Sequence, residues 1–265
     1  MKTKLDEIKE LIDDLSGSEL ESLRSYLRLK IGSHPLEQEW GITSDLILDA
    51  ISRSQDITKR GVRGVIAEAV FETQVLPTLR GWRSVKVEGD LSYDFKIQEE
   101  DTERILTIQV KLQRTEKGAP LKGRGTLPAD CFVVEIQKTR SGKKKAQSKT
   151  PGVHKEAGSE EKTRPYKFGD FDILAVNMQP SSRDWSRFMY TVGTWLVPRT
   201  EEQGLIQVMQ PVNSICSDVW TDSLEECVTW YKSGLKKVLL TLPRKEPKHA
   251  KKKSAQQSRK KRKRH

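Results

Sequence analysis

The sequence predicts an α/β protein of the mixed α+β kind, in which a central mixed β-sheet is flanked by helices, and three observations support this class. In short runs between residues 83 and 138, apolar side chains occupy alternate positions, which is typical of strands with one buried face. Residues 171–178 (FDILAVNM) are an almost continuous apolar run, as expected of a strand covered on both faces. Before the first of these runs, apolar residues recur at helical spacing.

Residues 1–55 are expected to form a helical segment that precedes the main domain. Apolar residues of 3–15 share one helical face, and Ser18 with Glu21 has the spacing of a capping box for a second helix, which we expect to end before Pro35. Such a helical hairpin is more typical of a packing or dimer element than of a recognition helix. The sequence leaves both open.

Residues 56–245 are predicted to be the main folded domain. A third helix is expected after Thr43 or Ser44, and a fourth from Asp56 to Pro77. The predicted strands, in chain order, are 83–89, 93–98, 105–113, 131–138, 171–178, 187–199 and 204–210, and a last amphipathic helix is expected at 224–240. The first three strands form a predicted meander, which the strand at 131–138 extends.

Positive charge is concentrated near the end of the chain. The net charge is +11, and residues 251–264 carry nine Lys or Arg and no acid, so the rest of the chain is close to neutral. We expect 246–265 to be a disordered basic tail that attracts a polyanion. The alternative is a solubilising or localisation extension. A polar stretch at 139–163 includes Lys143, Lys144 and Lys145, and is predicted to be a loop that either contacts a polyanion or is simply solvated.

The cysteine, histidine and hydropathy patterns argue against a zinc protein, a membrane-spanning protein and a secreted protein. The three cysteines form no Cys-x-x-Cys pair, and the four histidines have no zinc-ligand spacing, so we expect no zinc site and a reducing compartment. No run of about eighteen apolar residues predicts a membrane span. The first ten residues are charged and amphipathic, unlike a signal peptide.

Polar residues on two neighbouring predicted strands suggest the chemistry. Asp94 opens the second strand, and Gln109 and Lys111 lie on the third, separated by the apolar Val110. Because alternate side chains of a strand share a face, Gln109 and Lys111 project together, where Asp94 can reach the same place. A carboxylate, an amide oxygen and an ammonium group at one sheet edge suit a hard cation beside a phosphate.

With these residues, positions from about 60 to 178 resemble the PD-(D/E)XK nuclease superfamily, and specifically its restriction-endonuclease-like members. The resemblance rests on Glu68 in GVIAEAVF, Asp94 in SYDF, Gln109–Lys111 and the later strand in FGDFDILAV. The chain departs from the family pattern at Tyr93, where Pro is usual, and at Gln109, where Glu is usual. The resemblance implies a restriction-endonuclease-like core and makes 56–245 the catalytic domain.

The resemblance also implies roles for these residues around Mg²⁺. Asp94 would supply the anionic oxygen, Gln109 its side-chain oxygen and Val110 its backbone carbonyl, while Glu68 would approach a metal-bound water or a second ion. Lys111 would neutralise charge on the scissile phosphate and orient or deprotonate the attacking water. Without the resemblance, each residue has an ordinary explanation: a solvent-facing helix acid, a turn acid, and polar residues on a half-exposed strand.

Further residues are candidates for substrate contacts or structural support. The candidates for DNA contact are Gln113, Arg114, Arg140 and the lysines 143–145. Asp172 interrupts an apolar strand, and because a buried acid needs a partner, we expect it to pair with Arg164 or Arg140.

The function that these expectations favour is a type II restriction endonuclease that requires Mg²⁺. It would cut double-stranded DNA at a specific sequence and leave 5′-phosphates. A homodimer suits a palindromic site, since two-fold symmetry brings one active site to each strand. Such an enzyme would act in a prokaryotic cytoplasm, with a cognate DNA methyltransferase on the same sequence as its indirect partner. Two alternatives remain: a non-catalytic DNA-binding protein on a degenerate nuclease fold, and a repair or modification-dependent nuclease.

Deleting residues 249–265 should weaken binding to all DNA sequences alike. We expect these residues to provide sequence-independent phosphate contacts, for which the logarithm of the binding constant falls linearly with the logarithm of salt concentration. Binding measured across a salt series should therefore show a flatter slope for the deletion. A changed recognition sequence would contradict a purely electrostatic role.

Overall fold

The computed structural model describes residues 2–89, 91–137, 165–200, 202 and 204–240. The basic tail, the polar stretch at 139–163 and the candidate residues Arg140 and Lys143–Lys145 therefore lie outside the described residues. The chain divides into two compact units, residues 1–62 and 63–265, and each is described by itself.

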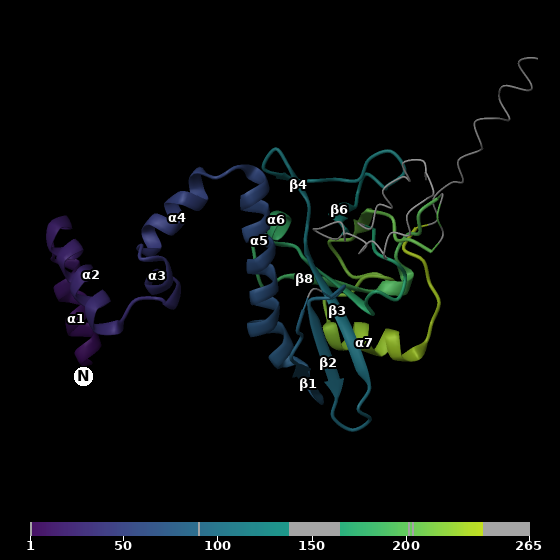
Figure 1. Ribbon diagram of the computed structural model, residues 1–265, viewed down its shortest axis with the longest axis horizontal. Coiled ribbons are helices and arrows are strands. Elements are labelled where there is room, and N and C mark those ends of the chain that lie inside the picture. The colour runs from purple at the N-terminus through teal and green to yellow at the C-terminus, as the bar shows by residue number, and fades with distance from the viewer. Residues whose placement is uncertain (1, 90, 138–164, 201, 203, 241–265) are drawn as a thin grey trace, which may run out of the picture. The chain divides into compact units, whose positions relative to one another are not determined.

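A five-stranded mixed sheet organises the larger unit, which confirms the predicted fold class (Figure 1). In spatial order its strands are β1 (Trp82–Val85), β2 (Phe95–Glu99), β3 (Ile105–Leu112), β7 (Ile173–Asn177) and β8 (Phe188–Val192). β1, β2 and β3 form the predicted antiparallel meander. β7 pairs parallel to β3, and β8 pairs antiparallel to β7, so β3 is the central strand.

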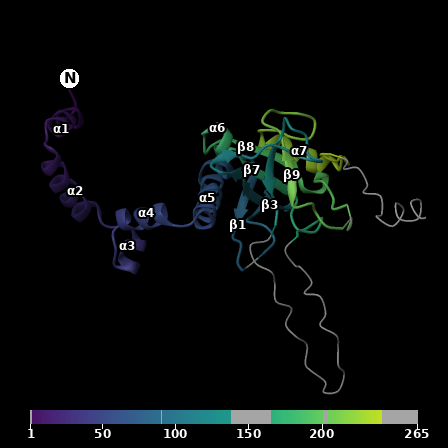
Figure 2. The same ribbon diagram turned by 90° about the horizontal axis from the view of Figure 1, so that it is seen from above.

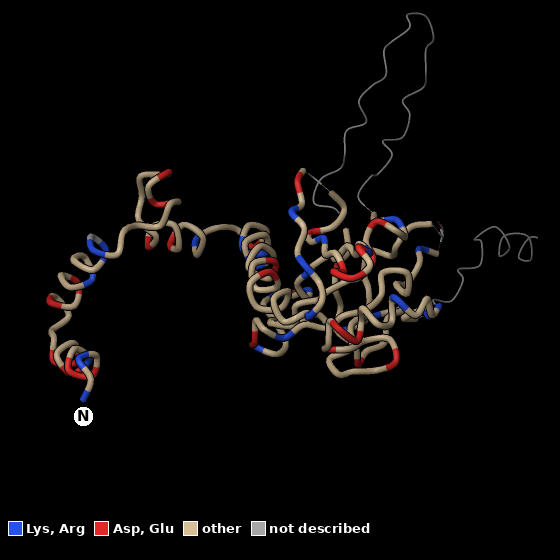
Figure 3. Tube along the Cα trace, turned by 90° about the horizontal axis from the view of Figure 1, so that it is seen from below, with Lys and Arg blue, Asp and Glu red and all other residues tan. Residues whose placement is uncertain are grey.

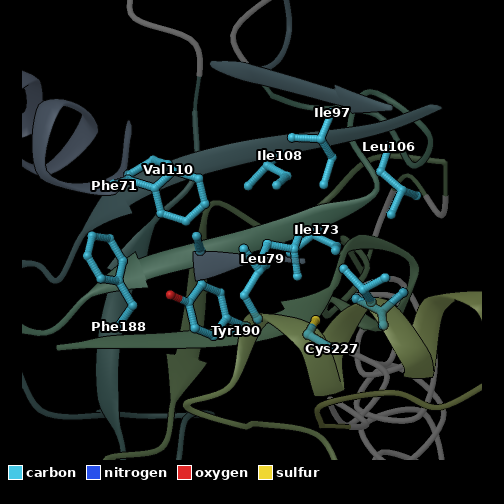
Figure 4. Close-up of a cluster of buried hydrophobic side chains, with 14 of the residues drawn as sticks. Phe71, Leu79, Ile97, Leu106, Ile108, Val110, Ile173, Phe188, Tyr190 and Cys227 are labelled. Atoms are coloured by element: carbon cyan, nitrogen blue, oxygen red, sulfur yellow. The ribbon is translucent and has the colours of Figure 1, made fainter. Parts of the chain in front are cut away.

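Two apolar clusters cover the two faces of this sheet. Ile173 and Ala175 of β7 belong to one cluster, and Leu174 and Val176 belong to the other, as expected when successive side chains alternate between faces. All five residues of β7 are buried, in agreement with the apolar run in the sequence. Figure 4 shows the first cluster, in which Phe71 lies near residues of β3 and β8.

The strand β6 (Phe132–Glu135) does not extend the meander, so that prediction was wrong. It pairs antiparallel with β9 (Met209–Val212) in a separate two-stranded sheet. The free edge of β3 is instead occupied by β7. The side chains of β7 are apolar and buried, so a central position in the sheet removes more apolar surface from water and stabilises this pairing. Between β3 and β6 the chain forms a small hairpin of β4 (Thr115–Glu116) and β5 (Ala119–Pro120).

Helices complete the larger unit (Figure 2). α5 (Asp56–Val70) crosses the boundary between the units and continues as a π-helical turn, η1 (Phe71–Val75), and a 3₁₀ turn, η2 (Leu76–Thr78). The sequence predicted a single helix here. Short helical segments are α6 (Gln179–Ser182) and η3 (Gly193–Trp195). α7 (Leu224–Ser233) ends earlier than predicted, because Gly234 adopts a left-handed conformation with φ of 67°.

The smaller unit contains α1 (Lys4–Asp13), α2 (Gly17–Ile31), α3 (Pro35–Trp40) and α4 (Ser44–Arg53). Thr43 is the N-cap of α4, which confirms one of the two predicted starts of this helix.

One local prediction in the smaller unit was wrong. The capping box of α2 is Ser16 with Glu19, whose carboxylate accepts the Ser16 backbone N–H at 2.8 Å, two residues before the predicted pair. The prediction that the second helix ends before Pro35 is confirmed, since α2 ends at Ile31 with Gly32 as its C-cap. Pro35 occupies the first position of α3, a helix that was not predicted, where its missing N–H costs nothing.

Among the described residues, no helix combines the length and the apolar character needed to cross a bilayer.

Candidate active site

The register between β2 and β3 places Asp94 beside the centre of β3. Phe95 pairs with Ile108, and the Asp94 backbone N–H donates to the Ile108 carbonyl at 3.0 Å. The Asp94 side chain then turns towards the next residues of β3, and its Oδ2 accepts the Val110 backbone N–H at 2.8 Å. The carboxylate is therefore fixed by backbone geometry.

Gln109 lies against the same carboxylate but is far more buried than a half-exposed strand would allow. The residue is 1% exposed, because β3 lies between β2 and β7 and the buried Tyr166 contacts its amide. Its Nε2 donates to Asp94 Oδ2 and, at 3.2 Å, to the Val110 carbonyl oxygen, while its Oε1 accepts from the Tyr166 hydroxyl at 3.0 Å. The nitrogen end of the amide thus faces Asp94, and the oxygen end faces Tyr166.

Lys111 completes the group on β3. Burial lowers the pKa of its ammonium, and the charges of Asp94 and Glu68 act in the opposite direction. The lysine is therefore close enough to both acids to interact with their charges, in an environment that water only partly reaches.

Glu68 joins these residues from α5. It follows the fully buried Ala67 and is partly buried itself, whereas Glu72, one turn later, is exposed. The pKa of Glu68 is raised, and burial is the largest cause. The charge of Asp94 raises the pKa further, while the charge of Lys111 lowers it. The two acids, Glu68 on α5 and Glu72 on η1, thus differ, and Glu68 shares the environment of the cluster formed by Glu68, Asp94, Gln109 and Lys111.

Burial also raises the pKa of Asp94 above its ordinary value, as the largest effect. The charge of Lys111 and the hydrogen bonds from Val110 and Gln109 oppose this rise. Two acids with raised pKa values and one lysine with a lowered pKa are typical of functional sites, because desolvation that opposes stability is retained where charge is needed.

A groove of 560 Å³ opens beside this cluster. α5 and η1 form one wall, with Val65, Glu68 and Ala69 from α5 and Glu72 from η1. The segment from β1 to the start of β2 forms the other wall, with Asp94 in the lining. The volume is within the usual range for ligand sites. Along the described trace of the larger unit, acidic and basic residues are interspersed (Figure 3).

The donor set fits a hard divalent cation. The Asp94 carboxylate and the Val110 carbonyl oxygen both contact the Gln109 amide nitrogen, so two oxygens converge on a single positively polarised group. Oxygen ligands of this kind suit Mg²⁺. Within the described ranges, no three His, Cys, Asp or Glu side chains form a metal-binding group, so a cation here would depend on the amide and the backbone carbonyl as well.

The other candidate residues are placed differently. Gln113 is 1% exposed, and its Oε1 accepts the backbone N–H of Ser181 in α6 at 3.0 Å, so it is buried in the structure and does not face the groove. Arg114 forms an ion pair with Glu135. The structure therefore does not bring these two residues to the Asp94 cluster.

Asp172 has neutral partners among the described residues. Its Oδ2 accepts from the Thr107 backbone N–H at 2.9 Å and from the Thr107 hydroxyl at 2.8 Å, and it also bonds the hydroxyl of Tyr231, whose pKa burial raises to about 12. The arginines expected to pair with it lie outside the described ranges. Sequence reasoning gave Tyr166 no role in the site, since its contact with Gln109 spans 57 positions and has no local pattern.

Comparisons with known proteins add little. No family model matches the chain, and no curated protein matches it. A solved structure of a bacterial homing endonuclease, I-Ssp6803I, is similar to this chain with 22% sequence identity and a TM-score of 0.27. The match covers 50% of this chain and 66% of the endonuclease chain, which is slightly less than two thirds of its length. The fold described above rests on the chain's own strand order.

Replacing Glu68 by Gln should stabilise the metal-free protein at pH 7.5. A raised pKa means that the ionised carboxylate opposes folding above that pKa, so the gain should be present at neutral pH and disappear as the pH falls below about 4. We expect about 0.5 kcal/mol in urea unfolding, allowing for solvent screening of a partly exposed group.

Glu72→Gln is the matched control, because it makes the same change one turn later at an exposed position. Equal effects of the two substitutions would show that Glu68 does not share the environment of Asp94.

Proposed function

We propose that this protein is a Mg²⁺-dependent endonuclease that hydrolyses phosphodiester bonds of double-stranded DNA. The observation that carries the proposal is the convergence of Asp94, Gln109 and the Val110 carbonyl beside Lys111, at the edge of a groove. Bound Mg²⁺ would supply Lewis-acid activation of water and positive charge for the phosphoryl oxygens.

The residues of the chain have separate tasks in this proposal. Asp94 holds the cation with its carboxylate, with the Gln109 and Val110 oxygens as further ligands. Lys111 faces the charge that develops on the scissile phosphate, and its lowered pKa makes its amine better able to exchange a proton with the attacking water. Glu68 orients water from the α5 side of the groove.

The finer proposal is a type II restriction enzyme that acts as a homodimer. Two strands of a palindrome require two active sites, which a two-fold dimer provides. The smaller unit offers apolar surface for such contacts, since Leu5, Leu11 and Ile31 are all more than half exposed. A cognate methyltransferase would protect the same sequence in the host.

A non-catalytic DNA-binding protein is the second candidate. The observation in its favour is that the nitrogen of Gln109, and not its oxygen, faces Asp94. Against it stand the buried Asp94 and Lys111, since burial of ionisable groups opposes stability and such groups are readily lost when catalysis no longer requires them.

Incubation with a sequenced plasmid and Mg²⁺ separates the candidates. A restriction enzyme gives discrete fragments with ends that map to one sequence, whereas a binding protein gives none. A repair or modification-dependent nuclease cuts only when branched or methylated DNA is supplied.

Asp94→Ala and Lys111→Ala should each reduce cleavage by about 10³-fold or more. Asp94→Ala removes the proposed cation ligand, and Lys111→Ala removes positive charge beside the reacting phosphate. DNA binding in Ca²⁺ should persist because it depends on other surfaces. Lys117→Met serves as a control, because Lys117 is exposed in the turn between β4 and β5 and should leave cleavage unchanged. Cleavage near the wild-type rate by either alanine variant would refute the assignment.

A further inference from the structure

Tyr166 is held against Gln109 by contacts of its hydroxyl, its ring and its backbone. Both residues are buried, and the hydroxyl of Tyr166 donates to Gln109 Oε1 at 3.0 Å. The Tyr166 ring packs edge-on against Phe171 with ring centres 5.4 Å apart, and its backbone carbonyl accepts the N–H of Ile206 at 2.8 Å. The hydroxyl therefore lies at a defined point behind the Gln109 amide.

The amide orientation follows from the groups at its two ends. Asp94 Oδ2 and the Val110 carbonyl are both acceptors, so the NH₂ end, which has two donors, belongs there. A reversed amide would place Oε1 against two oxygens with no proton between them. A cation at the same place has the opposite requirement, since only Oε1 can be its ligand.

We infer that Tyr166 is a positioning residue that serves both orientations of the Gln109 amide. The inference rests on the proposed function, because a bound cation is what requires the second orientation. When Oε1 turns towards the cation, Nε2 turns towards Tyr166, and the hydroxyl changes from donor to acceptor. Tyrosine can do both, whereas a Glu at position 109 would need only a donor throughout. Tyr166 is thus matched to glutamine.

The wild-type protein provides the first test, by following Mg²⁺ alone with ¹⁵N-labelled protein in NMR. The Gln109 side-chain NH₂ signals are identified by their loss in Gln109→Glu. We expect them to shift with the same midpoint as the Val110 backbone amide. If Val110 saturates while the Gln109 signals stay unchanged, the amide does not turn and the inference fails.

A failure of the proposed function has a different signature in this titration. In that case neither Val110 nor Gln109 responds to Mg²⁺, and both the metal site and the inference are overturned.

Tyr166→Phe provides the second test, because it keeps the ring and removes the hydroxyl. An unpaired buried N–H is tolerated less well than an unpaired carbonyl, so the metal-bound orientation should suffer more. We expect the Mg²⁺ midpoint to rise roughly three- to tenfold.

The matched comparison introduces Tyr166→Phe into the Gln109→Glu variant. In that variant, residue 109 has no side-chain N–H that the loss of the tyrosine hydroxyl could leave unpaired. There the Tyr166→Phe change should alter the midpoint by less than about twofold. Equal weakening in both backgrounds would indicate a merely structural tyrosine and would overturn the inference. Should Tyr166→Phe fail to fold, as thermal unfolding would show, the wild-type titration still decides.

Discussion

The burial of β3 between two neighbours and two apolar clusters is the constraint on which the site depends. β2 and β7 occupy both edges of β3, one face of β3 packs in the first apolar cluster, and Gln109 on the other face is buried against Tyr166 of the second, so side chains near the centre of β3 are largely removed from water. Any ionisable group placed there has a shifted pKa and opposes folding. The apolar packing of the surrounding sheet must therefore offset the cost of burying Glu68, Asp94 and Lys111.

The charge balance of the cluster explains why a glutamine suits position 109. With Glu68, Asp94 and Lys111 ionised, the cluster carries one formal negative charge. A divalent cation reverses this sign, and a phosphodiester then brings the total to neutrality. A glutamate at 109 would leave a residual negative charge after both had bound. With glutamine, the cation-bound cluster therefore keeps one positive charge that attracts the phosphate, in a low-dielectric setting where each charge matters.

The sequence predicted those features that depend on local periodicity. Alternating residues of β2 and β3 and the continuous run of β7 identified the sheet, and strand alternation put Gln109 and Lys111 on one face. Pairings between distant segments could not be predicted in this way. β6 and β9 have only four residues each and lie more than 70 positions apart, so nothing local identifies them as partners. Gln113 continues the same alternation but is buried by α6, which shows that a shared face does not ensure a shared site.

Helix ends show the same limit at short range. Ser16 and Ser18 both precede a glutamate by three positions, so spacing alone could not decide between them. Tyr166 is the corresponding case within the site, because its contact with Gln109 arises only once β7 has brought the preceding segment beside β3.

The helices of the smaller unit bury little apolar surface of their own. α1, α3 and α4 contain no buried residue, and Leu5, Leu11 and Trp40 are exposed, so these helices lack a core of their own. Burial of apolar surface is the main source of folding stability, and a unit with so little of it gains most from a partner surface. The proposed homodimer would supply that surface, and it would then couple the stability of the N-terminal helices to the assembly that two-strand cleavage requires.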